Sequence, residues 1–201
     1  MVPDEDLDLG ATVVAAFLEH PDVRTVELVG SRAHGTPMPL SDWDFTVEVD
    51  DVAAVADELP ALVSRLEPLA QQWDRLTSPS CYMLMLRGPV KVDLIFPAYP
   101  REFDPPWIVS AGTLDGIDRH FWDWILWLAS KRQRGDGWRV RSELGKMHVH
   151  LLRPMGVNEE PRGIHEAIDG YRGARDRLET ELRVVVPRRL ELEVLPVIPV
   201  G

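Results

Sequence analysis

The sequence predicts an α+β fold in which a strand-rich region comes first and a helical region follows. Two observations carry this prediction. Short apolar runs, one of them strictly alternating with polar residues, occupy the first hundred residues, and helical periodicity dominates from residue 114 onward. Between these regions, residues 96–106 contain four prolines. We therefore expect two domains, at 1–108 and 109–201, with their boundary at the end of the proline-rich stretch.

The first three expected elements are a helix and two strands. Residues 6–19 carry apolar side chains at helical spacing and are followed by Pro21, which indicates an amphipathic helix. Residues 23–29 have the composition of a β-strand and run into a Gly-Ser pair. Residues 42–49 alternate, so one face of this strand carries a polar set: Asp42, Asp44, Thr46 and Glu48.

A helix and a hairpin are expected next. From Asp51 to about Leu66 the apolar residues return at helical spacing, and Pro60 should kink or split that helix. Residues 80–87 and 90–96 are two β-rich runs separated by Gly88-Pro89. Such a pair of runs around a glycine-containing turn is typical of a β-hairpin.

The remainder of the chain is expected to be helical. The proline-rich stretch 96–106 should behave as a semi-rigid connector. Three helices are predicted beyond it, at 114–132, 138–153 and 162–184. The tail after Pro187 contains further prolines, and we expect it to pack as an extended arm.

Composition and charge limit the classes of function. The chain is 45% hydrophobic and 27% charged, as is ordinary for a folded protein, and its formal net charge is -11. That charge would repel a long polyanion and attract a cationic ligand, so we expect no nucleic-acid partner. The single cysteine, the absence of a signal-like N-terminus and the lack of a long apolar run predict a cytoplasmic protein without a membrane partner.

Three aspartates are the candidate metal ligands. Asp42 and Asp44 lie two residues apart on one strand, so their Cα atoms should be about 6.6 Å apart on the same face. Two carboxylates at that separation repel by roughly 2–3 kcal/mol at an effective dielectric constant near 20. Asp93 interrupts an otherwise apolar strand and is the candidate third carboxylate. Oxygen-only ligands favour Mg²⁺, or Mn²⁺, over zinc.

The Gly-Ser pair before the acidic strand suits phosphate binding. Gly30 would let a ligand approach backbone N–H groups closely, and Ser31 adds a hydroxyl donor. Phosphoryl chemistry fits the same region because two cations can clamp the attacking and leaving oxygens of an in-line displacement.

One motif consists of Gly30-Ser31, ten intervening residues, Asp42-Trp43-Asp44 and a later Asp93 in an apolar strand. This motif resembles that of the polymerase-β-type nucleotidyltransferase superfamily. The resemblance covers residues 26–96. It implies an N-terminal nucleotidyltransferase-type mixed sheet flanked by helices, Asp42 and Asp44 as metal ligands, and Asp93 as third ligand or general base. The helical remainder resembles the C-terminal domain of small antibiotic (aminoglycoside) nucleotidyltransferases.

Several other residues are candidates with open alternatives. Arg32 and Lys91 could contact the triphosphate, although a solvated arginine and a plain Lys91–Asp93 salt bridge are comparable interpretations. Lys131 could also bind triphosphate, but a cation at a helix C-terminus suits the helix dipole without any ligand. Glu143 and Trp127 are candidate contacts to the acceptor. His148 and His150 should point to different sides of a helix, so we do not assign them as metal ligands.

These observations favour a metal-dependent nucleotidyltransferase. It would move a nucleoside monophosphate, AMP from Mg-ATP in the first instance, to a hydroxyl of an aminoglycoside-like antibiotic, acting as a monomer or homodimer. The alternative is an antitoxin-type nucleotidyltransferase that binds or nucleotidylates a partner protein. A nucleotide-binding regulator without turnover is a third hypothesis, against which the intact acidic residues argue.

Overall fold

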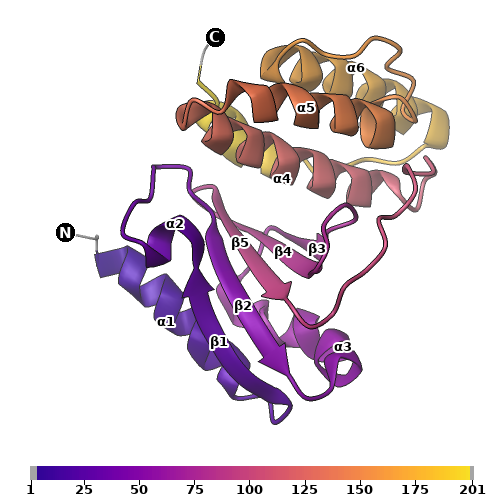
Figure 1. Ribbon diagram of the computed structural model, residues 1–201. Helices are drawn as coiled ribbons and strands as arrows, with labels where there is room; N and C mark the ends of the chain where they lie inside the picture. The colour runs from indigo at the N-terminus through magenta and orange to yellow at the C-terminus, as the bar shows by residue number, and fades with distance from the viewer. Residues whose placement is uncertain (1–3, 200–201) are drawn as a thin grey trace. The chain divides into compact units, whose positions relative to one another are not determined.

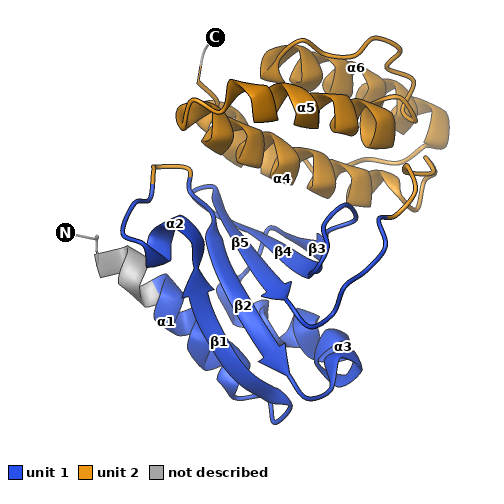
Figure 2. Ribbon diagram, viewed as in Figure 1, with its two compact units in different colours: residues 1–37, 41–103 blue, residues 38–40, 104–201 orange. Residues whose placement is uncertain are grey.

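The computed structural model describes residues 4–199, which form two compact units (Figure 2). Unit 1 comprises residues 1–37 and 41–103, and unit 2 comprises residues 38–40 and 104–201. The first unit contains the sheet, and the second consists of helices and their connections (Figure 1).

Unit 1 contains three α-helices and five strands within the described residues. In chain order they are α1 (Asp4–Leu18), β1 (Val23–Val29), α2 (Gly30–Ala33), β2 (Trp43–Val49), α3 (Val52–Leu62), β3 (Ala70–Trp73), β4 (Ser80–Leu86) and β5 (Val90–Phe96). The predicted first helix, the two predicted strands and the predicted hairpin are all present.

The five strands form one mixed sheet in the order β1-β2-β5-β4-β3. The neighbours β2 and β5 run parallel, and the other three pairs of neighbours are antiparallel. Because β5 lies between β2 and β4, a strand from late in the unit is inserted beside the acidic strand. This topology places residue 93 next to residue 44.

One face of the sheet packs on α1 and α3 (Figure 1). The inward residues of β2 alternate along the strand, as the sequence predicted, and Phe45 and Val47 are fully buried there. Phe17 from α1 and Leu59 from α3 complete the apolar layer. The polar residues of β2 therefore emerge on the opposite face of the sheet.

Helix α3 is shorter than the sequence predicted. Asp51 caps it by accepting hydrogen bonds from the backbone N–H groups of Ala53 and Ala54. The helix continues through Pro60 to Leu62, and Ser64–Leu66 forms a separate 3₁₀ turn. Proline near the end of a helix leaves one carbonyl without its usual N–H donor, which favours an early end to regular α-helix.

The edge strand β3 was not predicted. Its sequence is Ala-Gln-Gln-Trp, and neither its length nor its two glutamines give a two-residue hydrophobic pattern. It forms because β4 offers a free edge and pairs with it in antiparallel register, with Gln72 opposite Met83.

Unit 2 is helical over its described residues. Its elements are α4 (Leu114–Gln133), α5 (Gly137–Met147), a π-helical turn (His148–Leu152), α6 (Ile164–Leu182), α7 (Arg189–Val194) and a 3₁₀ turn (Leu195–Val197). The three predicted helices correspond to α4, to α5 with its π-helical turn, and to α6. Over residues 4–199, no helix combines the length and apolar character needed to span a membrane.

The prediction of an extended arm after Pro187 was wrong. Helix α7 forms there because Leu190 and Val194, one helical turn apart, are buried together. Between them, Glu191 accepts a hydrogen bond from the buried Arg175 of α6 at 2.5 Å. The prolines lie on either side of this short helix and do not interrupt it.

A buried polar group connects α4 with α6. Asp118 accepts hydrogen bonds from the indole N–H of Trp122 at 3.1 Å and from the hydroxyl of Tyr171 at 2.5 Å. Burial raises the pKa of the Asp118 carboxyl to about 6, against the lowering effects of the Tyr171 hydroxyl and of Arg175.

The whole arrangement is α+β, as the sequence predicted. Five strands in one mixed sheet and seven α-helices make up the described chain. This architecture is consistent with a nucleotidyltransferase fold followed by a helical C-terminal part.

Candidate metal centre

The register of three strands brings two of the predicted aspartates side by side. Val29, the last residue of β1, pairs with Asp44 on β2, and Asp44 pairs with Asp93 on β5. Because directly paired residues on neighbouring strands have their side chains on the same face, both carboxylates project from the face opposite α1 and α3.

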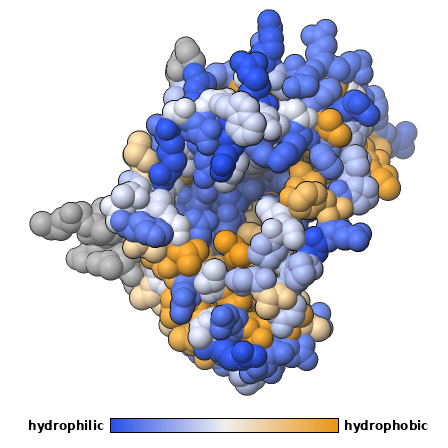
Figure 3. Space-filling view, in the orientation of Figure 1, coloured by the Kyte–Doolittle hydropathy of each residue, from blue (hydrophilic) through white to orange (hydrophobic). Residues whose placement is uncertain are grey.

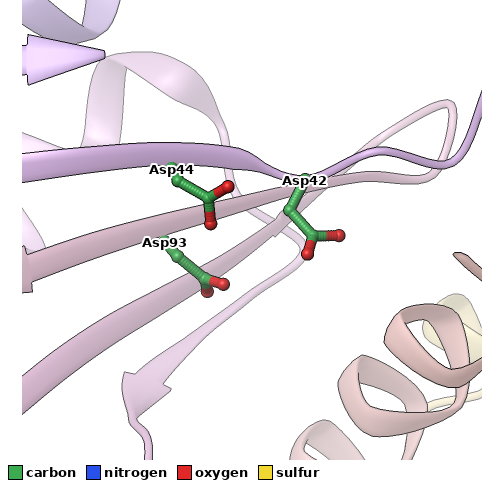
Figure 4. A group of neighbouring side chains, drawn as sticks. All are labelled: Asp42, Asp44 and Asp93. Atoms are coloured by element: carbon green, nitrogen blue, oxygen red, sulfur yellow. The ribbon is translucent and has the colours of Figure 1, made fainter. Parts of the chain in front are cut away.

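Asp42 completes the group from the segment just before β2. One carboxylate oxygen from each of Asp42, Asp44 and Asp93 lies within 4.8 Å of the others (Figure 4). Figure 4 shows the three carboxyl groups pointing into a common space. Within the part of the chain that the structure describes, this is the one cluster of three or more histidine, cysteine or acidic residues close enough to share a metal ion.

The donor set fits a hard divalent cation. Each pair of charges at such separations repels by roughly 3–4 kcal/mol at an effective dielectric constant near 20, so three ionised carboxylates are mutually unfavourable. All the donors are oxygens, which Mg²⁺ and Mn²⁺ prefer; Asp44 and Asp93 lie on paired strands, and Asp42 lies just before β2. Lys91 offsets part of this repulsion at Asp93, and a bound divalent cation would offset the remainder.

Gly30 is required by its contact with Asp44. Its φ is +70°, and a Cβ atom added to it would lie 2.4 Å from Oδ2 of Asp44. Any other residue would therefore combine a left-handed backbone with a collision against a candidate metal ligand. The glycine of the Gly-Ser pair is thus explained by the packing of the site itself.

The segment between the two halves of the motif is held by local hydrogen bonds. The backbone N–H of Thr36 donates to the carbonyl of Ser31 at 2.9 Å. Nδ1 of His34 donates to the carbonyl of Gly30 at 2.5 Å. Sequence reasoning did not single out His34, because a histidine in a polar turn gives no periodic or motif signal.

Arg32 bridges the two halves of the motif. Its Nε and Nη2 atoms donate to the carbonyl of Ser41 at 3.3 and 3.0 Å, and its guanidinium carbon lies 4.2 Å from the centroid of the Trp43 ring. The side chain that sequence reasoning assigned to nucleotide binding is therefore also a structural contact of the loop.

Lys91 lies beside Asp93 on β5. Its Nζ is 2.6 Å from Oδ1 of Asp93, and the lysine side chain is almost entirely buried. Of the two interpretations drawn from the sequence, the salt bridge is observed directly. Contact of Lys91 with a phosphate remains a prediction.

The remaining candidate residues belong to unit 2. Lys131 Nζ lies 4.7 Å from the centroid of the Trp127 ring, so these two residues of α4 form a cation–π pair. Glu143 of α5 is paired with Lys146 at 2.6 Å. The ring Nε2 of the buried His148 is 3.0 Å from the carbonyl oxygen of Val157, so this nitrogen is engaged in a hydrogen bond.

Comparison with known proteins gives structural resemblances only. No family model matches the sequence, and no curated protein matches it. One similar solved structure is an aminoglycoside 6-adenyltransferase from Bacillus subtilis, at 12% identity and a TM-score of 0.31, covering 90% of this chain and 93% of that one. Another is the polymerase core of TRAMP, an RNA surveillance complex, at 13% identity and a TM-score of 0.37. This alignment covers 97% of the present chain and 57% of that one.

Proposed function

We propose that this protein is a metal-dependent nucleotidyltransferase that transfers a nucleoside monophosphate from a nucleoside triphosphate to a hydroxyl group of a small molecule. The observation that carries the proposal is the convergence of Asp42, Asp44 and Asp93 beside Gly30. Clustered carboxylates next to a glycine turn provide cation ligands and a close backbone approach for phosphate in one place.

The three aspartates would hold Mg²⁺, with Mn²⁺ as a substitute. One or two such cations would neutralise the triphosphate and stabilise charge on the attacking and leaving oxygens of an in-line displacement. In the proposed reaction the acceptor oxygen forms a bond to the α-phosphorus, the bond to pyrophosphate breaks, and a carboxylate takes the hydroxyl proton. Asp93 is our first choice for that proton acceptor.

The residues around the cluster have separate proposed tasks. Backbone N–H groups near Gly30 and the hydroxyl of Ser31 would bind the triphosphate tail, where donors to anionic oxygens are needed. Lys91, already next to Asp93, is proposed to contact phosphate oxygens. ATP is the first donor to test.

The helical unit is proposed to supply acceptor binding. Its candidate contacts are Trp127 and Glu143, an aromatic face and a carboxylate. An aromatic ring and an acidic group suit a ligand with both apolar ring surface and amines. We propose an aminoglycoside-like polycation, which also fits the net charge of -11.

The test is pyrophosphate release from ATP with aminoglycosides and lincosamides as acceptors, in wild type and in Asp42→Asn, Asp44→Asn and Asp93→Asn. We expect each variant to lose about a hundredfold or more in kcat, because several kcal/mol of charge stabilisation disappear. Mn²⁺ binding, followed by electron paramagnetic resonance, should weaken in the same variants.

The matched control is Glu48→Gln, which neutralises another carboxylate on the same face of β2, outside the cluster. It should retain Mn²⁺ binding and turnover. Full activity in Asp42→Asn or Asp44→Asn, with the fold intact by circular dichroism, would disprove the proposed metal assignment. Co-purification of a stable partner protein, with no small-molecule turnover, would instead support the antitoxin-type alternative.

A further inference from the structure

The three aspartates are not held in the same way. Asp44 and Asp93 are paired residues inside the sheet, so strand hydrogen bonding holds their backbones. Asp42 precedes Trp43, which is the first residue of β2 and pairs with Val92. Its carboxylate nevertheless meets the other two within 4.8 Å. The strand pairing of β2 holds its neighbour Trp43 and does not include Asp42 itself.

Arg32 contacts both residues that flank Asp42. On one side it donates two hydrogen bonds to the carbonyl of Ser41, which belongs to the peptide group leading into Asp42. On the other side its guanidinium lies over the ring of Trp43. Ser41, Asp42 and Trp43 are all at least nine-tenths buried, so this short segment has little room to shift.

The Trp43 ring under the Arg32 guanidinium is held by its own packing contacts. A Cβ atom added to Gly10 of α1 would lie 3.1 Å from the ring of Trp43, so the helix backbone is closely packed against the indole. Trp43 also stacks on Phe45 with 6.2 Å between ring centroids and 7° between planes. These contacts hold the Trp43 ring against α1 and β2, and the Arg32 guanidinium packs on that ring.

We infer that Arg32 is a positioning residue for Asp42, and that it affects cation binding through Asp42 rather than by contacting the nucleotide. This inference rests on the proposed function, since it assigns Asp42 to the cation site. Residues behind metal ligands that orient them typically contribute ten- to a hundredfold to metal affinity. Arginine suits the task because its planar group can donate two hydrogen bonds and stack on an aromatic ring at once.

Simple electrostatics and positioning predict opposite results for Arg32→Ala. Removal of a positive charge near a cation site should strengthen cation binding if charge alone matters. If Arg32 positions Asp42, the same change should weaken Mn²⁺ binding by about tenfold. Arg32→Lys keeps the charge but loses the planar fork and the stacking, so it should also weaken binding.

The experiment is a titration of the full chain with Mn²⁺ alone, followed by electron paramagnetic resonance, in wild type, Arg32→Ala, Arg32→Lys and the control Arg24→Ala. Arg24 is paired with Asp50 on the surface of unit 1, so its loss should leave the affinity unchanged. Thermal melting checks the fold of each variant, and Arg32→Lys provides the test if Arg32→Ala does not fold.

A double-mutant cycle with Asp42→Ala separates positioning from direct nucleotide contact. If Arg32 acts through Asp42, adding Arg32→Ala to Asp42→Ala should cause no further loss of Mn²⁺ affinity and no rise in the Kd for ATP. Unchanged or tighter Mn²⁺ binding by both folded Arg32 variants would overturn the inference. So would a full additional loss in the double variant.

Failure of this inference differs from failure of the proposed function. If alanine at positions 42, 44 and 93 leaves Mn²⁺ binding intact, the cation site and the proposed function both fail. If those three variants lose Mn²⁺ binding while Arg32→Ala and Arg32→Lys retain it, the cation site stands and the positioning inference alone is overturned.

Discussion

At the scale of single residues, Gly30 is the position where the structure restricts the choice of amino acid most clearly. Alanine at this position would take a left-handed backbone, at about 1–2 kcal/mol, and its Cβ atom would meet Oδ2 of Asp44 at 2.4 Å. We therefore expect Gly30→Ala to lower the free energy of unfolding by at least that amount and to weaken Mn²⁺ binding. Urea unfolding and Mn²⁺ titration measure the two effects separately.

Gly35 provides the matched control for this prediction. Its φ is +68°, nearly that of Gly30, but a Cβ atom added there would meet nothing within 4 Å. Gly35→Ala should carry a similar backbone cost and leave Mn²⁺ affinity unchanged. Equal losses of Mn²⁺ affinity in both variants would show that backbone strain, not the contact with Asp44, explains the glycine.

A second prediction at this scale concerns Asp118 in unit 2. Burial raises the pKa of its carboxyl to about 6, so between pH 4 and 6 the folded state binds a proton that the unfolded state has lost. The stability contributed by the neutral form is complete below about pH 4 and is lost as pH rises through about 6. The loss should be on the order of 2–3 kcal/mol.

The measurement is urea unfolding from pH 4 to pH 7 in wild type and in Asp118→Asn. The amide does not titrate and can still accept hydrogen bonds from Trp122 and Tyr171. We expect wild type to lose stability relative to the variant as pH rises across this range. A constant difference between the two proteins would contradict the raised pKa. Other carboxylates, present in both proteins, cancel in the comparison.

At the scale of elements, the sequence was most informative where local pattern and tertiary environment agree. β2 alternates because one of its faces meets α1 and α3, so its span and the polar face that carries Asp44 could be predicted. The strand begins at Trp43, so the prediction that Asp42 lies on it was wrong by one residue. The partnership with Asp93 was suggested by an acid in an apolar strand. It depended on the parallel pairing of β2 with β5, which no local pattern encodes.

The elements that sequence reasoning missed depend on long-range contacts. β3 is defined by the edge of β4, since its own four residues have no strand periodicity. α7 is too short to be stable alone and depends on burial of its apolar side chains against the rest of the unit. The structural task of Arg32 was also hidden, because its partner Ser41 is nine residues away.

The ion pair at Glu191 gives an element-scale prediction. Glu191 joins α7 to α6 through Arg175, which is 2% exposed, and through Arg172 at 3.0 Å. Glu191→Gln removes one charged partner of the buried Arg175, which keeps its contact with Asp176, and the lost charged hydrogen bonds should cost about 1–3 kcal/mol. Chemical denaturation at pH 7 measures the loss.

Glu181→Gln is the control for that experiment. It breaks the exposed ion pair with Arg177 on the surface of α6 and should cost well under about 1 kcal/mol. If Glu191→Gln proves as mild as this control, α7 is held by its apolar side chains alone. The charged contacts would then be unimportant for anchoring the helix.

At the scale of the whole molecule, charge is divided unevenly between the two units. Unit 1 contains eighteen acidic and seven basic residues, whereas unit 2 contains fifteen of each. The net charge of -11 therefore belongs entirely to the unit that carries the aspartate cluster. Unit 2 is neutral, and the face of it seen in Figure 3 is mainly hydrophilic.

This distribution leads to a prediction about salt. A polycationic acceptor should be attracted by the field of unit 1, and salt shortens the range of that field from about 10 Å at 0.1 M to about 3 Å at 1 M ionic strength. We expect KM for an aminoglycoside to rise several-fold between 0.05 and 0.5 M KCl, and kcat to change much less. Pyrophosphate release at saturating Mg-ATP measures both constants.

Lincosamides, with fewer amines, should show a weaker dependence of KM on salt. An aminoglycoside KM that is independent of salt would mean that the acidic surface of unit 1 plays no part in acceptor binding and serves solubility alone.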